Sequence, residues 1–265
     1  MTKNKVAGDV KFMKSQGFVY ACSQDTWLEE TIRSALSVKK VMPDVERELY
    51  VTENIFPVNR KILESAFTKV VSLQEINFPH RPRFESFLMT TLDHAVFIDG
   101  DTLILEPCYE LFQVLDDFEI ALCLAPQLHH FKAIKSNLHS FLPFVSMAVS
   151  EFNGGLIVAK NTEKFRNFIK IWMQLFRICL SREYGMDQAS LRIALSKSDL
   201  RVATLPNNYN FRANLAQSVA GVVKILHCHG ELEEIAKIIN QQISIRLYTP
   251  PAQLIHGMKP LKKEA

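Results

Sequence analysis

Short apolar runs of strand length alternate along the chain with longer amphipathic stretches. The apolar runs are rich in β-branched and aromatic residues, which favour strands. The predicted strands span residues 18–23, 48–52, 69–73, 96–98, 102–105, 119–125, 152–159, 202–205 and 222–226. Helices are predicted over 59–67, 84–92, 109–115, 162–180, 187–195 and 231–241. This alternation predicts an α/β fold with right-handed βαβ units, a mostly parallel central sheet and helices on both faces.

The first and the longest predicted helices show their buried faces in the sequence. Thr26 and Glu29 have the spacing of a capping box, and Pro43 marks the end of the first helix. Its expected buried residues are Leu28, Ile32, Ala35 and Leu36. The helix over 162–180 gathers Phe165, Phe168, Ile169, Trp172, Phe176 and Cys179 or Leu180 on one side. That side is expected to pack on the sheet, with a membrane surface or a homodimer contact as the alternatives.

The composition is typical of an ordinary globular protein and does not indicate a particular binding partner. The 265 residues are 48% hydrophobic and 22% charged, as in ordinary globular domains, and the net charge of +3 does not call for nucleic acid. The five cysteines form no CxxC pair, which fits a reducing cytoplasm better than a zinc site or a disulfide framework. No stretch has the length and apolarity of a signal peptide or a membrane span. We expect one cytoplasmic domain over 1–265, with 250–265 as a C-terminal tail.

Asp99 and Asp101 follow an apolar strand directly and are separated only by Gly100. In open α/β sheets, ligands bind beyond the carboxyl ends of the strands. Two carboxylates at one strand end repel each other unless a cation or hydrogen-bond donors absorb their charge. Mg²⁺ or Mn²⁺, which prefer oxygen ligands, are the natural candidates. A solvated acidic turn is the plainer alternative, but the apolar runs on both sides of the pair argue against it.

Two further motifs carry polar groups at the ends of predicted elements. Asn153 precedes Gly154 and Gly155 at the start of a strand, where glycines allow either a bulge or the close approach of a ligand. Asp187 and Gln188 begin a helix. Asp187 could simply be its N-cap, or the pair could face a reacting centre.

His227, His229 and Gly230 follow the last predicted strand, and Arg83 precedes the helix before the acidic strand. A histidine after a strand is more often structural than a ligand, yet this group combines a possible metal ligand with a glycine that permits close approach. Arg83 could pair with a phosphate or a carboxylate, or be a solvated loop cation.

Taken together and in order, these motifs resemble glycosyltransferases of the nucleotide-diphospho-sugar transferase superfamily, most of all family 8. The resemblance covers residues 18–230. It rests on Arg83, Phe-Ile-Asp-Gly-Asp-Thr-Leu-Ile, Phe-Asn-Gly-Gly-Leu-Ile-Val, Asp187-Gln188, Leu-Pro-Asn-Asn-Tyr-Asn and Ile-Leu-His-Cys-His-Gly. It implies the Rossmann-like GT-A fold and sugar transfer from a nucleotide-diphosphate donor, with a uridine nucleotide expected and with retention of configuration.

The resemblance also implies roles for residues. Asp99, Asp101 and His227 would hold Mn²⁺ or Mg²⁺ at the donor diphosphate. Asp187 and Gln188 would be catalytic. The donor would be bound by Ala21, Cys22, Ser23, Arg83, Asp99, Gly100, Asn153, Gly154, Gly155, His229 and Gly230. The acceptor would be a hydroxyl of a glycan, a lipid-linked sugar or a protein, and a peripheral membrane contact stays open.

The sequence departs from the family pattern in two places. Relatives commonly continue the histidine motif with Gly-x-x-Lys-Pro-Trp, whereas acidic residues follow Gly230 here; His256 and Lys259 are a faint echo that could close over the donor. The second glycine, Gly155, is a milder departure. An irregular stretch over 126–150, with His129, His130 and His139, could be a lid on the acceptor side.

Two other functions compete with sugar transfer. The same fold could bind a nucleotide sugar without transferring it, which the missing lysine motif keeps open. A phosphatase resembling the haloacid-dehalogenase group is the other alternative. Asp99, Asp101 and Thr102 are only loosely similar to the nucleophile motif of that group, because the threonine follows the second aspartate at once and the motif lies far from the N-terminus.

Overall fold

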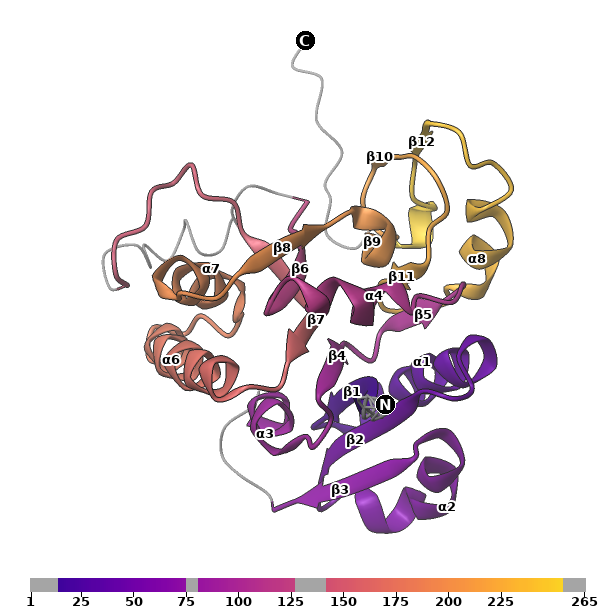
Figure 1. Cartoon of the computed structure of the whole chain (residues 1–265). Helices are drawn as coiled ribbons and strands as arrows, with labels where there is room; N and C mark the ends of the chain where they lie inside the picture. Colours follow the sequence, from indigo (N-terminus) through magenta and orange to yellow (C-terminus); the bar gives the residue numbers. More distant parts are fainter. Residues whose placement is uncertain (1–13, 75–80, 127–141, 255–265) are drawn as a thin grey trace, which may run out of the picture.

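The computed structural model describes residues 14–74, 81–126 and 142–254. Its central sheet has seven strands in the order β3-β2-β1-β4-β7-β6-β8 (Figure 1). The strands are β1 (Gln16–Cys22), β2 (Glu46–Thr52), β3 (Lys69–Leu73), β4 (His94–Ile98), β6 (Ile120–Leu124), β7 (Phe152–Lys160) and β8 (Val202–Leu205). Neighbouring strands are parallel except where β7 pairs with β4 and β6. The predicted mostly parallel sheet is confirmed.

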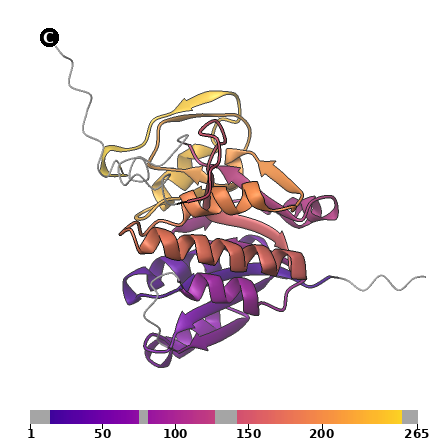
Figure 2. The same ribbon diagram turned by 90° about the vertical axis from the view of Figure 1, so that its left-hand side faces the viewer.

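Helices cover both faces of this sheet (Figure 1). One face carries α3 (Arg81–Met89), α6 (Glu163–Leu180) and α7 (Gln188–Lys197), and the other carries α1 (Leu28–Val41), α2 (Phe56–Ala66) and α4 (Glu110–Gln113). Figure 2 shows the first of these layers from the front, with α6 between α3 and α7. Thr162 begins α6 by accepting a hydrogen bond from the backbone N–H of Phe165.

Each strand of the central sheet contributes side chains to two apolar cores, one on each face of the sheet. On β4, Ala95 and Phe97 face the α3–α6–α7 layer, whereas Val96 and Ile98 face the α1–α2–α4 layer. Because successive strand residues point to opposite faces, strands buried on both sides must be apolar throughout. This is why the sequence shows continuous apolar runs at these strands.

Two small sheets stand beyond the carboxyl end of β4. The first has the order β5-β11-β9, formed by β5 (Thr102–Ile104), β9 (Phe211–Arg212) and β11 (Ile225–His227). The second pairs β10 (Gln217–Val219) with β12 (Arg246–Tyr248). With α8 (Glu233–Ile239), they enclose a third apolar cluster. The prediction of a single domain stays a prediction.

Several local predictions are wrong for identifiable reasons. Thr26 lies in a 3-10 turn (Asp25–Trp27), α1 begins only at Leu28, and no side chain caps it. Leu36 is 43% exposed, so it does not belong to the buried face of α1. The short strands β9, β10 and β12 were not predicted because, unlike the equally short β5 and β11, they do not lie in a longer apolar run.

Two stretches with predicted roles lie outside the described residues. They are residues 127–141, with His129, His130 and His139, and residues 255–265, with His256 and Lys259.

Replacement of Phe165 by alanine tests the packing of α6. The Phe165 ring is fully buried, with ring centroids of Phe97 and Phe87 5.9 and 6.2 Å away. Loss of a buried phenylalanine ring leaves a cavity and is expected to lower the free energy of unfolding by about 3–5 kcal/mol. Urea denaturation measures the change.

Ile171→Ala is the matched control, because Ile171 lies on the same helix and is 45% exposed. We expect it to change the free energy of unfolding by less than about 1 kcal/mol. Equal losses in the two variants would contradict the packing of α6 described above.

Candidate active site

The acidic pair lies where three sheet elements meet. Asp99 follows β4, and its backbone N–H donates to the Gly155 carbonyl of β7 at 3.0 Å. The Asp101 carbonyl accepts from the backbone N–H of Cys228, just after β11, at 2.9 Å. These backbone bonds fix the turn between β4 and β5 from both sides. The position agrees with the rule that ligands bind at the carboxyl ends of parallel strands.

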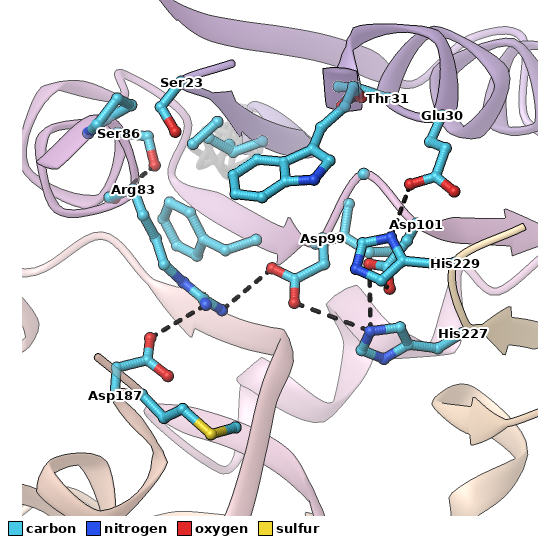
Figure 3. A pocket seen from close by; sticks show the side chains of 18 of the residues that line it. Ser23, Glu30, Thr31, Arg83, Ser86, Asp99, Asp101, Asp187, His227 and His229 are labelled. Atoms are coloured by element: carbon cyan, nitrogen blue, oxygen red, sulfur yellow. Dashed lines mark hydrogen bonds and ion pairs between the residues drawn. The ribbon is translucent and has the colours of Figure 1, made fainter. Parts of the chain in front are cut away.

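His227 joins the two aspartates to form a compact group of possible metal ligands. Ligand atoms of Asp99, Asp101 and His227 all lie within 4.8 Å of one another. The His227 Nε2 atom is 3.3 Å from Asp101 Oδ1 and 3.8 Å from Asp99 Oδ2 (Figure 3). Two carboxylates and one imidazole are a donor set that suits Mn²⁺, with Mg²⁺ accepted through the oxygens. The side chains present therefore fit a divalent cation.

Asp101 is the more enclosed of the two aspartates and is 9% exposed. Burial opposes its ionised form, but the neighbouring imidazoles of His227 and His229 and the guanidinium of Arg212 outweigh that effect and hold the pKa of Asp101 well below its usual range. The carboxylate is thus ionised, as a metal ligand must be.

Arg83 connects Asp99 to Asp187. Its Nη1 atom is 3.1 Å from Asp187 Oδ2, and its Nη2 atom is 3.5 Å from Asp99 Oδ1 (Figure 3). Nη2 also donates to the carbonyl of Gly154. Burial opposes the charged guanidinium, but Asp99, Asp187 and Asp101 outweigh it and raise the Arg83 pKa. Arg83 is therefore no solvated loop cation, and it carries a fixed positive charge between two carboxylates.

Asp187 is not used as a helix cap. It is the residue before α7, but its side chain makes no capping hydrogen bond, and its carboxylate points to Arg83 (Figure 3). A capping carboxylate would instead accept from the first N–H groups of the helix. The plainer interpretation of Asp187 is therefore wrong.

A cavity of about 390 Å³ opens above these groups. Nine of the predicted site residues line it: Ala21, Ser23, Arg83, Asp99, Gly100, Asp101, Asp187, His227 and His229. They come from β1, α3, the β4–β5 turn, the start of α7 and the end of β11. The structure thus brings together residues that lie up to about two hundred positions apart in the sequence.

Six other predicted residues do not line the cavity: Cys22, Asn153, Gly154, Gly155, Gln188 and Gly230. The Cys22 thiol is buried and donates to the Gln24 carbonyl. Gln188 is buried, and its amide donates to the carboxylate of Glu151, so the structure directs it away from the cavity. The Asn153 amide oxygen faces the protein interior, where it accepts from Gly155 N–H and Asn210 Nδ2.

Side chains of the protein approach both Gly155 and Gly100 closely. A Cβ on Gly155 would lie 2.1 Å from Cε1 of His227, and a Cβ on Gly100 would lie 2.2 Å from Oγ1 of Thr31. Such contacts are far closer than real Cβ atoms show. Gly155 therefore makes room for the imidazole, which places His227 beside Asp99.

Several lining residues were missed by the sequence analysis, among them Trp27, Glu30, Thr31 and Arg212. The first three follow β1 and share one face of the chain at the start of α1, with the i, i+3, i+4 spacing that could have revealed them. Arg212 lies on a two-residue strand, which gave no signal.

Glu30 holds the segment after β11. Its carboxylate accepts from His229 Nδ1 at 2.8 Å and from the backbone N–H of Gly230 at 2.8 Å. Gly230 has a φ of +99°, a backbone conformation that favours glycine. Burial opposes the charged imidazole of His229, but the hydrogen bond to Glu30 and the charges of Asp101, Glu30 and Asp99 outweigh it and raise its pKa.

Comparison with known proteins identifies the fold. No family model matches the chain, and no curated protein matches it in sequence. An active-site variant of LgtC superposes with a TM-score of 0.59 at 14% identity, covering 89% of this chain and 98% of its own. The chain has the GT-A fold. Mouse xyloside xylosyltransferase 1 shares it at 11% identity, with a TM-score of 0.52 and coverage of 81% of this chain and 97% of its own.

The GT-A fold also appears within a longer protein. GlyE from Streptococcus pneumoniae TIGR4 superposes with a TM-score of 0.53 at 15% identity, covering 88% of this chain and 58% of its own. Within the part of our chain that the structure describes, no helix is long and apolar enough to cross a membrane.

Alanine at Gly155 tests the link between this glycine and the metal-ligand group. The new Cβ would displace the imidazole of His227, and we expect the affinity for Mn²⁺ alone to fall by roughly 10- to 100-fold, the range for changes that disturb the support of a metal ligand. Mn²⁺ titration followed by electron paramagnetic resonance measures this.

Gly154→Ala is the matched control. The atoms nearest a Cβ there belong to the Arg83 guanidinium, the closest at 3.3 Å, and not to His227, so Mn²⁺ affinity should stay near that of the original protein. An unchanged affinity in Gly155→Ala, with the fold verified by circular dichroism, would contradict the role of Gly155.

Proposed function

We propose that this protein is a metal-dependent glycosyltransferase that moves a sugar from a nucleotide-diphosphate sugar to a hydroxyl acceptor. One observation carries the proposal: Asp99, Asp101 and His227 form a possible metal site at the floor of a cavity, beside the Arg83–Asp187 ion pair, on a GT-A fold. The cavity volume of about 390 Å³ lies in the range of small-ligand sites, about 300–1,000 Å³.

The cavity has the chemistry expected of a nucleotide-sugar site. Ala21 and Ser23, at the end of β1, and Trp27, which is 42% exposed, line the same cavity as the acidic pair. An exposed indole offers a flat apolar surface that suits a nucleobase. In our proposal the nucleoside lies against these residues, and the diphosphate lies at Asp99 and Asp101. A uridine nucleotide is the donor base that we expect.

The charges that develop during sugar transfer indicate the role of each residue in the cavity. Breakage of the sugar–phosphate bond builds negative charge on the diphosphate, and a divalent cation held by Asp99, Asp101 and His227 would supply Lewis-acid stabilisation. Asp187 faces the cavity as a carboxylate paired with Arg83, so it can stabilise positive charge that develops at the anomeric carbon. Arg83 holds that carboxylate in place and can also contact the donor.

The proposal extends to the acceptor class. LgtC, which shares this fold, is a galactosyltransferase that has been studied in complex with donor and acceptor sugar analogues. By analogy we propose a hydroxyl of a glycan or glycolipid as the acceptor here, transfer with retention of configuration, and a cytoplasmic location. Gln188 contacts Glu151 and not the cavity, so we assign it to the support of α7 and not to catalysis.

Nucleotide binding tests the proposed function. In a thermal-shift panel of UDP, GDP, CDP and ADP, with and without Mn²⁺, we expect one nucleotide, UDP, to raise the melting temperature only when Mn²⁺ is present. A ligand at 100 times its dissociation constant adds about 2.7 kcal/mol to the stability of the folded state. The stabilising nucleotide then defines the sugar donors, whose turnover is followed by release of that nucleotide.

Asp101→Asn is the variant that links this response to the site. It keeps the size of the side chain but removes its charge, so the Mn²⁺-dependent shift should vanish. Asp116→Asn, which changes an exposed carboxylate far from the cavity, should respond like the original protein. No shift with any nucleotide would contradict the proposal, and a shift without donor turnover would favour a nucleotide-sugar-binding protein.

A further inference from the structure

A chain of hydrogen bonds runs from the backbone of β7 to the side of His227 that faces away from the aspartates. Gly155 N–H donates to Asn153 Oδ1 at 2.9 Å, and Asn210 Nδ2 donates to the same oxygen at 2.9 Å. Asn210 Oδ1 lies 2.6 Å from Nδ1 of His227. Asn210 and His227 are 4% and 3% exposed, so these bonds form inside the protein.

The direction of every bond in this chain follows from its first member. A backbone N–H can only donate, so the Asn153 atom that faces Gly155 is its carbonyl oxygen. The Asn210 atom that faces this oxygen must then be the amide nitrogen, which turns Asn210 Oδ1 to the imidazole. Because that oxygen can only accept, the proton of a neutral His227 must be on Nδ1. The Nε2 atom keeps its lone pair.

Arg212 leads to the same tautomer from the opposite side. Its Nη1 atom is 3.3 Å from Nε2 of His227. A guanidinium has donors and no acceptor, so it can hydrogen-bond to Nε2 only where that atom carries a lone pair. Nε2 also lies nearest the carboxylate oxygens of Asp101 and Asp99, which are themselves acceptors only, so a cation between these atoms satisfies the lone pair and both carboxylates.

We infer that Asn153 and Asn210 are positioning residues, which hold His227 in the Nδ1–H tautomer and aim the Nε2 lone pair at the proposed metal position. This inference rests on the proposed function for the identity of the ligand. It gives Asn153 a role other than the donor contact that the family resemblance implies. Groups that hold the second nitrogen of a metal-binding histidine fix its tautomer and orientation and raise its basicity.

Two measurements test the inference, and neither uses the activity of the enzyme. The first is the tautomer of His227, read from long-range ¹H–¹⁵N spectra of metal-free protein labelled on histidine over a series of pH values, because these spectra distinguish the two neutral tautomers from the charged imidazole. The signal is assigned by its loss in His227→Gln. We expect the Nδ1–H tautomer in the original protein and a mixture of tautomers in Asn210→Ala.

The second measurement is the affinity for Mn²⁺ alone, with no nucleotide or sugar present. Asn210→Ala and Asn153→Ala should each weaken it by about 10- to 100-fold, as other changes behind metal-binding histidines do. Asn153→Asp keeps an oxygen that accepts from Gly155 and Asn210, so its affinity should equal or exceed that of the original protein. Asn161→Ala, which removes an amide bonded to Thr90 and Arg166 beyond the other end of β7, is the control.

The outcomes separate this inference from the proposed function. If Asn153 serves only the donor sugar, Asn153→Ala will leave Mn²⁺ affinity and the His227 tautomer unchanged, and the inference is overturned. If the original protein binds neither Mn²⁺ nor Mg²⁺, the proposed function fails, and the spectra alone decide whether the amide chain sets the tautomer. Thermal melting verifies that each variant is folded, and Asn153→Ala stands in if the more buried Asn210 does not tolerate replacement.

Discussion

Negative charge at one end of the sheet is the constraint that the rest of the site must satisfy. Asp99, Asp101 and Asp187 converge on one cavity, and two like charges 4 Å apart repel by roughly 4 kcal/mol at an effective dielectric constant of 20. Arg83 supplies one fixed positive charge, between Asp99 and Asp187. Asp101 is stabilised from another side, chiefly by His227. A divalent cation would add the charge that one guanidinium cannot supply.

The topology of the chain explains how His227 reaches this place. β11 is antiparallel to β5, and their register sets His227 opposite Thr102, next to Asp101. β9 lies parallel on the other side of β11 and sets Arg212 opposite His227. The metal-ligand group thus depends on three short strands, of which β5 lies about a hundred positions before β9 and β11 in the sequence. Incorrect pairing of β5, β11 and β9 would move His227 away from the aspartates, although these three strands are not part of the seven-stranded sheet.

The sequence was sufficient for the long strands and helices and for nine of the residues that line the cavity, but not for the direction of individual side chains. Continuous apolar runs identify strands such as β4, because burial on both faces leaves no other pattern. Residues after such strands, including Asp99 and Asp101, could therefore be expected at one edge. Whether Gln188 points to the cavity or to Glu151 depends on contacts between elements, which no local pattern contains. The same holds for Asn153, whose partner Asn210 is 57 positions away.

The second glycine on β7 now has a physical explanation. Judged against the family pattern alone, Gly155 is a departure that weakens the resemblance. In the structure its missing Cβ leaves the space that Cε1 of His227 needs, and its N–H begins the chain of amides that ends at Nδ1. One backbone position thus supplies both the room for the imidazole and the hydrogen bond that orients it. The departure strengthens the metal-site interpretation, because an ordinary side chain at position 155 would exclude the third ligand.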